Sequence, residues 1–403
     1  MRTFLLIDGH NFSYRNLYAL PKPRSGKYLD KKHDRDLFKQ QLITQLLNLF
    51  NTWRSVMDGA VLVWDFGSWR KELLKSEFAG EVEYKGTRNT EERVNMKYFS
   101  ECIGEFKEWV KLCKVAQCEL YGAEGDDWIC AITHRLNGRG DKVIIYSNDG
   151  DLNQLVVDGV MQLAKNGEKY NLFVSENDAE NLSRHEHINV IDSMLNGGVS
   201  APDAMKMLIG EMVVSKKVEI VPVKSQVALF KKIMVGDKSD NIPSVCRVVK
   251  NGRTYGISEK MCDAILEDFY AKSGIGAITE ACYSNDELSG LLCESILSVA
   301  KEKIKYDGDL DSVRHGLARN IKYVVLGIST APEKVADGMT MRIDNMLADG
   351  GYVNWSAIEQ WRNENANVVK KVEVNGLSSV LGTEGKDTDW SFIKKDDSNG
   401  KLF

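Results

Sequence analysis

Acidic residues gather in three short motifs of this chain. They are Glu124–Asp127 (EGDD), Asn148–Asp151 (NDGD) and Gly236–Asp240 (GDKSD). Carboxylates held this close repel one another unless a cation lies between them, and a set of oxygen ligands without His or Cys selects Mg²⁺ or Mn²⁺ over zinc. Each motif alone has an ordinary explanation as a helix cap or a turn. Together they predict a site for divalent metal ions.

Two further acids, Asp8 and Asp65, stand at comparable places. Asp8 follows the apolar run Thr3–Ile7, and Asp65 follows Ala60–Trp64. Both runs are predicted strands, as is Lys142–Tyr146 just before the second motif. The carboxyl ends of parallel strands open on a common crevice, so these acids are expected to converge there. The predicted metal ligands are Asp8, Asp65, Glu124, Asp126, Asp127, Asp149, Asp151, Asp237 and Asp240.

The elements that must position these acids alternate between strands and helices. Apolar residues recur with a helical period in 36–53, residues 92–115 have a long, mixed helical pattern, and 126–136 is a predicted helix. A further predicted strand covers 116–121. This alternation predicts an α/β fold with a mostly parallel sheet flanked by helices.

The pattern along the chain also predicts where its parts begin and end. Residues 1–167 form the predicted α/β core, with an arch at about 67–115, and 168–227 interrupt the alternation as a predicted insertion with a β-like run at 218–223. Residues 228–327 complete the metal site and then become helical. Residues 328–403 are a predicted C-terminal extension, partly flexible, whose end is polar.

Composition limits the classes of protein that this chain can be. No apolar run approaches the ~20 residues of a membrane span, and the N-terminus lacks the pattern of a signal peptide, so we expect a cytoplasmic protein. Its 8 cysteines form no CxxC pair and are expected to be buried thiols. The net charge is −5, but Val213–Lys260 holds ten lysines and arginines against four acids, as expected where phosphate binds, although a solvated lysine-rich surface has the same signature.

Six short pieces follow one another along the chain. They are Leu6–Asn11 (LIDGHN) with Tyr14–Arg15, Val63–Asp65 (VWD), Glu83–Arg88 (EYKGTR), Glu124–Asp127 (EGDD), Ser147–Asp151 (SNDGD) and Met234–Pro243 (MVGDKSDNIP). In type and order they resemble the 5′-nuclease (flap endonuclease-like) superfamily, and most closely its bacteriophage ribonuclease H/5′–3′ exonuclease branch. The resemblance covers residues 1–165 and 228–325. It implies a PIN-like 5′-nuclease fold with a C-terminal helix–hairpin–helix region.

The resemblance also implies roles for the acids and for the arch. A first Mg²⁺ would be held by Asp8, Asp65, Glu124, Asp126 and Asp149, and a second by Asp149, Asp151, Asp237 and Asp240, with Mn²⁺ as a substitute. Asp127 would bind directly or support a ligand. Lys85 and Arg88 would contact the scissile phosphate, and Tyr84 would stack on the terminal base. The arch segment 67–97 has seven basic and six acidic residues, so it is not the strongly basic arch that threading of a single strand would favour.

Further residues are expected to bind substrate. The turn Gly256–Lys260 (GISEK) looks like a helix–hairpin–helix variant, which presents backbone N–H groups to duplex phosphates and in this family often binds K⁺. The predicted substrate-binding residues, besides Tyr84, are Arg15, Arg247, Lys250, Arg253, Gly256 and Lys260.

The activity that this resemblance implies is two-metal hydrolysis of phosphodiesters, as a 5′–3′ exonuclease and flap endonuclease with ribonuclease H activity. It would remove RNA primers and adjacent DNA during lagging-strand replication, in the host cytoplasm if the chain is phage-encoded. The partners implied are DNA and RNA–DNA hybrids, and the C-terminal tail could dock on a sliding clamp or single-strand-binding protein. A non-catalytic DNA-binding protein on this fold and a small PIN-type ribonuclease are the alternatives.

Three other motifs invite a functional interpretation that the sequence does not favour. Asp307–Asp311 starts like a calcium loop but lacks its later ligands, so a solvated turn is expected. His185–His187 (HEH) has no further ligands nearby and is interpreted as surface histidines. His10 could act as a base, but a packing or supporting role is at least as good an interpretation.

Overall fold

The computed structural model describes residues 2–23, 26–54, 57–76, 78, 81, 84–86, 93–167, 169–183, 218–348 and 358. Within them, one sheet organises the fold, in the strand order β3-β2-β1-β4-β5-β6-β7. The strands are β1 (Thr3–Asp8), β2 (Gly59–Val63), β3 (Ala116–Cys118), β4 (Lys142–Tyr146), β5 (Val160–Asn166), β6 (Lys169–Val174) and β7 (Val218–Pro222). Neighbouring strands are parallel except β5 and β6, which confirms the predicted mostly parallel sheet.

Helices cover both faces of the sheet because side chains alternate along the buried strands. Leu5 and Ile7 of β1 face a core shared with α1 (Gly9–Tyr18), α2 (Lys32–Trp53) and α5 (Met96–Leu112). Phe4 and Leu6 face the opposite core, shared with α6 (Gly125–Asn137) and α15 (Glu333–Ala348). The central strands β1, β2 and β4 are therefore largely buried.

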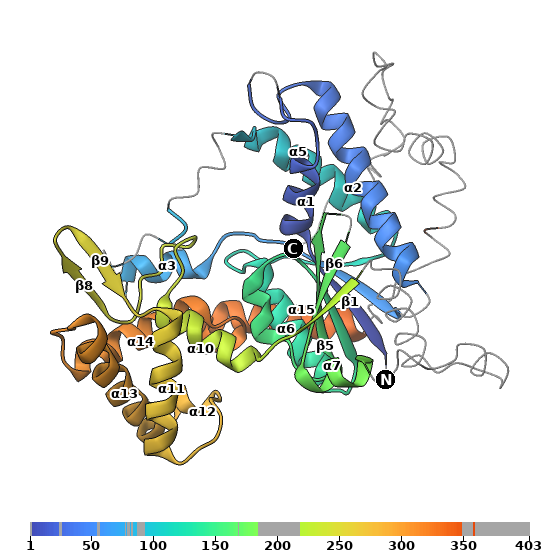
Figure 1. Ribbon diagram of the computed structural model, residues 1–403. Coiled ribbons are helices and arrows are strands. Elements are labelled where there is room, and N and C mark those ends of the chain that lie inside the picture. The colour runs from blue at the N-terminus through green and yellow to red at the C-terminus, as the bar shows by residue number, and fades with distance from the viewer. Residues whose placement is uncertain are drawn as a thin grey trace, which may run out of the picture.

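A helical lobe with its own core lies beside the sheet (Figure 1). Its elements are α10 (Ser225–Val235), β8 (Arg247–Lys250), β9 (Arg253–Gly256), α11 (Glu259–Ser273), α12 (Ala281–Ser284), α13 (Asp286–Ile304) and α14 (Leu310–Val324). The strands β8 and β9 form an antiparallel ribbon separate from the main sheet. Part of the expected arch attaches to this lobe, since Phe78 and Tyr84 belong to its core, whereas α5 of the same segment packs on the sheet. Glu81 contacts His315 (2.7 Å) and Arg319 (3.3 Å) on α14.

The remaining described elements are α3 (Trp69–Ser76), α7 (Glu176–Ser183) and the 3₁₀ helices η1 (Gly150–Leu155) and η2 (Ile328–Thr330). Segment 168–227, expected as an insertion, supplies β6 and β7 to the main sheet, so both of its described ends are part of that sheet. The expected strand at 116–121 is shorter, ending at Cys118. All 8 cysteines are free and buried, as predicted.

Asp309 caps α14 by accepting a hydrogen bond from Ser312 N–H (2.9 Å), which fits a turn better than a calcium loop. No helix in the described ranges has the length and apolar character needed to cross a bilayer. The histidine motif at 185–187 and the tail expected to bind a clamp lie outside the described residues.

Candidate metal centre

The first group of acids lies where β1, β2 and β4 end. Asp8 ends β1 and caps α1, accepting hydrogen bonds from Asn11 N–H (2.9 Å) and from the Ser147 hydroxyl (3.0 Å). Burial, followed by the charges of Asp65 and Asp149, raises the pKa of Asp8 to about 7. The convergence predicted from the strand ends is therefore present in the structure.

Asp65 is fixed by its neighbours on two sides. Its carboxylate accepts a hydrogen bond from Gly125 N–H, and a Cβ on that glycine would approach the same oxygen to 3.0 Å. Its own N–H donates to His10 Nδ1 (3.1 Å). Burial lowers the pKa of His10, although the charge of Asp65 opposes this. His10 therefore supports Asp65 with a neutral ring.

Asp126, in the first turn of α6, is a further member of this group. Burial, then the charges of Asp149 and Asp8, raises its pKa well above the usual range of a carboxyl group. Burial and like charges therefore both disfavour the ionised forms of Asp8 and Asp126. A divalent cation that prefers oxygen ligands fits this cluster of acids, because its positive charge favours the ionised carboxylates.

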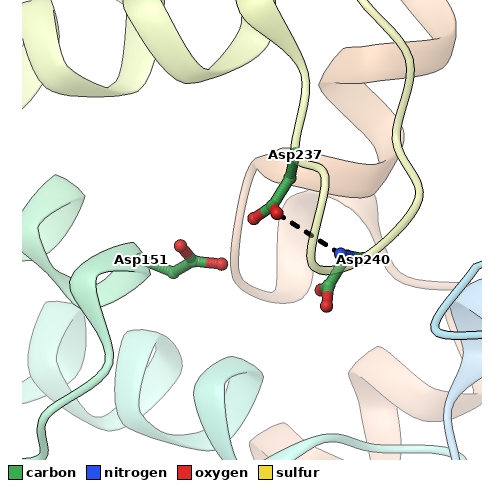
Figure 2. A group of neighbouring side chains, drawn as sticks. All are labelled: Asp151, Asp237 and Asp240. Atoms are coloured by element: carbon green, nitrogen blue, oxygen red, sulfur yellow. Dashed lines mark hydrogen bonds between the residues drawn. The ribbon is translucent and has the colours of Figure 1, made fainter. Parts of the chain in front are cut away.

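The second group consists of Asp151, Asp237 and Asp240, shown in Figure 2. One carboxylate oxygen from each lies within 4.8 Å of the others, the only set of three metal-ligating residues in the described part of the chain that meets this distance. Lys232 of α10 contacts both Asp151 and Asp237 (2.8 Å to the latter). Burial opposes ionisation of Asp237, but its bonds to Lys232 and Ser239 lower the pKa of that carboxyl to about 2.

The loop that carries Asp237 and Asp240 is closed by backbone pairing. Asp237 and Ile242 exchange N–H···O hydrogen bonds of 2.8 and 2.7 Å. Gly236 has a φ of +79°, and a Cβ there would lie 2.3 Å from Ile242 O. The buried amide of Asn320 on α14 donates to Pro243 O (2.8 Å) and so fixes the end of the loop. Only glycine fits this position, which gives a physical reason for Gly236 just before Asp237.

Asp127, predicted to bind metal or support a ligand, does not face the other acids. It is fully buried, and its carboxylate accepts two hydrogen bonds of 2.8 Å from Arg70, one from Trp69 (2.9 Å) and one from Gly327 N–H (3.1 Å). These donors occupy both oxygens. We therefore remove Asp127 from the set of direct ligands and assign it to the anchoring of α6.

Glu124 also differs from its predicted role. Its carboxylate accepts hydrogen bonds from Arg70 (2.9 Å), Tyr84 (3.2 Å) and Lys85. Burial opposes ionisation, but Lys85 and Arg70 lower the pKa of Glu124 to about 2. In this geometry Glu124 anchors the cations beside the site, and its role as a ligand would require it to exchange these partners.

The predicted catalytic cation Lys85 lies at the junction between the two groups. Its ammonium contacts Glu124, and its backbone N–H donates to Asp240 O (3.1 Å), with φ at +57°. Burial opposes the charge, but Glu124 raises the pKa of Lys85 above its ordinary value, so it stays protonated. Arg88, the other predicted catalytic residue, lies outside the described residues.

Tyr84 does not fit the stacking role that was predicted for it. Its side chain is 6 % exposed, its ring packs on Tyr323 (5.5 Å between centroids), and its hydroxyl donates to Glu124. A buried ring has no free face for a base. The Tyr84 hydroxyl finds its hydrogen-bond partner, Glu124, inside the protein, which the sequence alone does not reveal.

The remaining predicted substrate-binding residues lie at two places. Arg15, half-buried, donates to Tyr146 OH (2.6 Å) and Asn148 Oδ1 (3.1 Å) near the first group. Arg247, Lys250, Arg253 and Lys260 are exposed on the lobe. Gly256 has a packing role instead, because a Cβ there would lie 2.7 Å from the Ser244 side chain. The hairpin between α10 and α11 is a β-ribbon.

Sequence reasoning missed Arg70, Lys232 and Asn320. Arg70 and Asn320 are buried, and Lys232 is largely so, and all three hold the acids or their loops through contacts between distant segments. Only one signal was available: an arginine in an otherwise apolar helical face (Trp69-Arg70) needs an acidic partner when it is buried. Nothing in the sequence indicates which acid that is.

Comparisons with known proteins agree with these motifs. Residues 3–183 match the family described as 5′-3′ exonuclease, N-terminal resolvase-like domain. A 5′-3′ exonuclease of Aquifex aeolicus is 29% identical over 162 residues, which is 40% of this chain, and the chain spans only 50% of that relative.

Among solved structures, a bacteriophage T5 5′-exonuclease with bound zinc is similar at 19% identity and a TM-score of 0.47, covering 85% of this chain and 99% of that one. A T5 flap endonuclease in a complex with DNA and metal ions has 18% identity and a TM-score of 0.44, covering 86% and 99% of the two chains. Both likenesses are distant.

Proposed function

Because residues 3–183 match the family of 5′-3′ exonuclease N-terminal domains, we propose that this chain is a divalent-metal-dependent 5′-nuclease of the 5′-nuclease superfamily. It hydrolyses phosphodiesters near 5′ ends, flaps and nicks in DNA or RNA–DNA hybrids. The metal is Mg²⁺, bound as two ions, with Mn²⁺ as a substitute. The biological task is removal of RNA primers and adjacent DNA.

One observation carries the proposal. Acids from four separate segments converge at the ends of β1, β2 and β4, and burial together with mutual repulsion raises the pKa of Asp8 and Asp126. A protein that needed only stability would not keep such a group, because uncompensated buried charge is costly. The proposed ligands are Asp8, Asp65, Asp126 and Asp149 for one ion, and Asp149, Asp151, Asp237 and Asp240 for the other.

When bound there, the divalent ions supply activation of water as a nucleophile and neutralisation of the charge on the phosphodiester. The chain's own residues supply position. Ser147 and Asn11 orient the carboxylate of Asp8, and Gly125 orients that of Asp65. The Lys232 ammonium contacts the carboxylates of Asp151 and Asp237, so it must give up some of these contacts when a metal ion binds to them.

Lys85 adds a fixed positive charge beside the acids. Because Glu124 holds its ammonium and Asp240 holds its backbone, the cation stays near the reacting phosphate without a large loss of entropy when substrate binds. Arg88 would act with it, as the resemblance to the superfamily implies.

The lobe is the proposed contact for duplex DNA. Arg247 and Arg253 lie on the exposed β8–β9 ribbon, and Lys260 lies in the first turn of α11. Such cations bind phosphates without reading bases, which suits an enzyme that recognises the structure of its substrate. A K⁺ ion at this hairpin, and a clamp or single-strand-binding protein at the tail, belong to the same proposal.

The decisive experiment compares cleavage of a labelled 5′-flap, a nicked duplex and an RNA–DNA hybrid by the full chain, with Mg²⁺ and with chelator. Asp149→Ala should abolish Mg²⁺-dependent cleavage of each. Asp311→Ala, which removes an exposed acid on α14, is the matched control and should leave cleavage unchanged.

Two results would decide against the proposal. Cleavage that survives both chelation and Asp149→Ala would show that the acids are not the catalytic centre. Binding of flaps with no cleavage under any divalent ion would favour the non-catalytic DNA-binding alternative.

A further inference from the structure

Two aromatic rings stand exposed next to the proposed metal centre. Tyr121 is 74% exposed and Phe66 is 52% exposed, and Tyr121 is the most exposed large apolar side chain in the described part of the chain. Their ring centroids lie 5.5 Å apart at an interplanar angle of 85°. This edge-to-face contact orients the two rings, and the high exposure of Tyr121 leaves its surface accessible.

The backbone holds these rings on a rigid frame. Phe66 N–H donates to Ala123 O (3.1 Å), Gly122 N–H donates to Phe66 O (2.7 Å), and Trp69 N–H donates to Gly122 O (2.7 Å). Gly67 and Gly122 have φ of +84° and +91°. A Cβ on Gly67 would lie 3.8 Å from the Tyr121 ring, so that ring packs against the Gly67 backbone.

This frame is continuous with the acids. Phe66 directly follows Asp65, and Tyr121 stands three residues before Glu124. In the strand order β3-β2-β1-β4, the acids after β1 and β4 lie to one side of Asp65. Phe66 follows β2, next to Asp65 itself, and Tyr121 follows β3, the strand on the other side of β2. A strand of nucleic acid that passes the acids and continues along this edge therefore reaches Tyr121 and Phe66.

We propose that Phe66 and Tyr121 form a stacking site for one nucleobase of the unpaired strand, next to the phosphate held at the acids. The inference rests on the proposed nuclease function and names a subsite of it. An unpaired base offers a free π-face, whereas bases in a duplex have theirs covered. The site would therefore favour substrates whose strand is single-stranded at that point, whatever its sequence.

The test measures binding of a short 5′-flap DNA in chelator, so that cleavage does not interfere. Wild type, Tyr121→Ala and Phe66→Ala are each titrated against the intact flap and against flaps with a single abasic site at successive positions around the junction. Tyr121→Ala should weaken binding of the intact flap by about 5- to 160-fold, the ~1–3 kcal/mol typical of a base–aromatic stack.

The abasic series separates stacking from a structural role. At one position, removal of the base should weaken binding to wild type as much as Tyr121→Ala weakens binding of the intact flap. Tyr121→Ala should then cause no further loss of affinity for that abasic flap. Tyr121→Phe should keep the affinity because the ring remains. Leu112→Ala, which removes a side chain that is 53% exposed on α5, should change nothing.

Either of two outcomes overturns the proposal. Equal loss on intact and abasic flaps at every position would show that Tyr121 acts through the fold, and unchanged affinity in both alanine variants would show that the rings do not contact the base. Failure of the nuclease proposal is distinguishable, since it would appear as absence of metal-dependent cleavage by wild type, which is measured separately.

Discussion

Replacement of Arg70 by methionine should be among the most destabilising single changes near the site. The guanidinium is 1% exposed, and it donates to Asp127 twice, to Glu124 and to Val325 O. Without it, fully buried Asp127 keeps only Trp69 and Gly327 as donors. Removing one partner of a buried ion pair costs about 3–5 kcal/mol, because the other charge is left uncompensated.

The assay is urea-induced unfolding of the full chain in chelator, followed by circular dichroism. Arg70→Met should lower the free energy of unfolding by about 3–5 kcal/mol. Arg135→Met is the matched control, since it breaks the exposed pair with Asp344 and should cost less than about 1 kcal/mol. The double variant Arg70→Met/Asp127→Leu should recover part of the loss, because it leaves no unpaired charge at that position.

A loss for Arg70→Met no larger than that of the Arg135 control would refute this reasoning. It would mean that water or a rearranged side chain compensates Asp127, and that the pair does not anchor α6. Arg70→Lys sharpens the test. It keeps the charge but cannot form the two parallel bonds, so an intermediate loss is expected.

Three further predictions concern the acids, an arch contact and the loop. Asp126→Asn should abolish metal-dependent cleavage yet raise the thermal midpoint of the metal-free protein by a few degrees, about 2–4 °C per kcal/mol, because it removes a repelled buried charge; a lower midpoint would contradict this. Burial favours the neutral form of Glu81, but its partners His315 and Arg319 on α14 lower the pKa of its carboxyl group. The ionised Glu81 therefore stabilises the fold above the reference pKa of 4.5, and this stabilisation is lost as pH falls through the lower pKa of the folded state. Glu81→Gln should therefore destabilise by up to about 1 kcal/mol at neutral pH and hardly at all in acid, as seen by unfolding at both pH values, and an equal loss at both would refute the ion-pair explanation. Gly236→Ala should lower both stability and cleavage rate more than Gly252→Ala. Both glycines have a positive φ, which costs alanine roughly 1–2 kcal/mol, but only at Gly236 would a Cβ also lie 2.3 Å from a backbone oxygen. Equal losses in the two variants would show that the loop relaxes.

The sequence predicted the elements better than the contacts between them. Strands β1, β2 and β4 were predictable because each is a short apolar run followed by an acid, and parallel strands bring their ends together. Asp127 could not be separated from Asp126 in the same way. Adjacent positions on a helix point about 100° apart, so one of the two faces the acids and the other faces Arg70, but the sequence does not say which.

The exposure of aromatic rings was also unpredictable. Tyr84 lies in a motif that resembles a substrate-binding segment, yet it is buried, whereas Tyr121 lies in no motif and is exposed. Exposure depends on which segments cover a side chain, and these are distant in sequence. Lys232 was counted among the basic residues of its segment, but only the packing of α10 beside η1 shows that it lies between Asp151 and Asp237.

The three closely spaced acids belong to two separately packed bodies. Asp151 stands on η1, whose Leu152 and Leu155 pack in the sheet's core, whereas Asp237 and Asp240 stand in a loop that follows α10 of the lobe. A metal ion bound by all three acids would link these two bodies, so the affinity of the site for the ion would depend on how closely the lobe packs against the sheet. A substitution deep in the lobe core could then weaken metal binding without touching a ligand, and substrate that draws the lobe toward the sheet would tighten it.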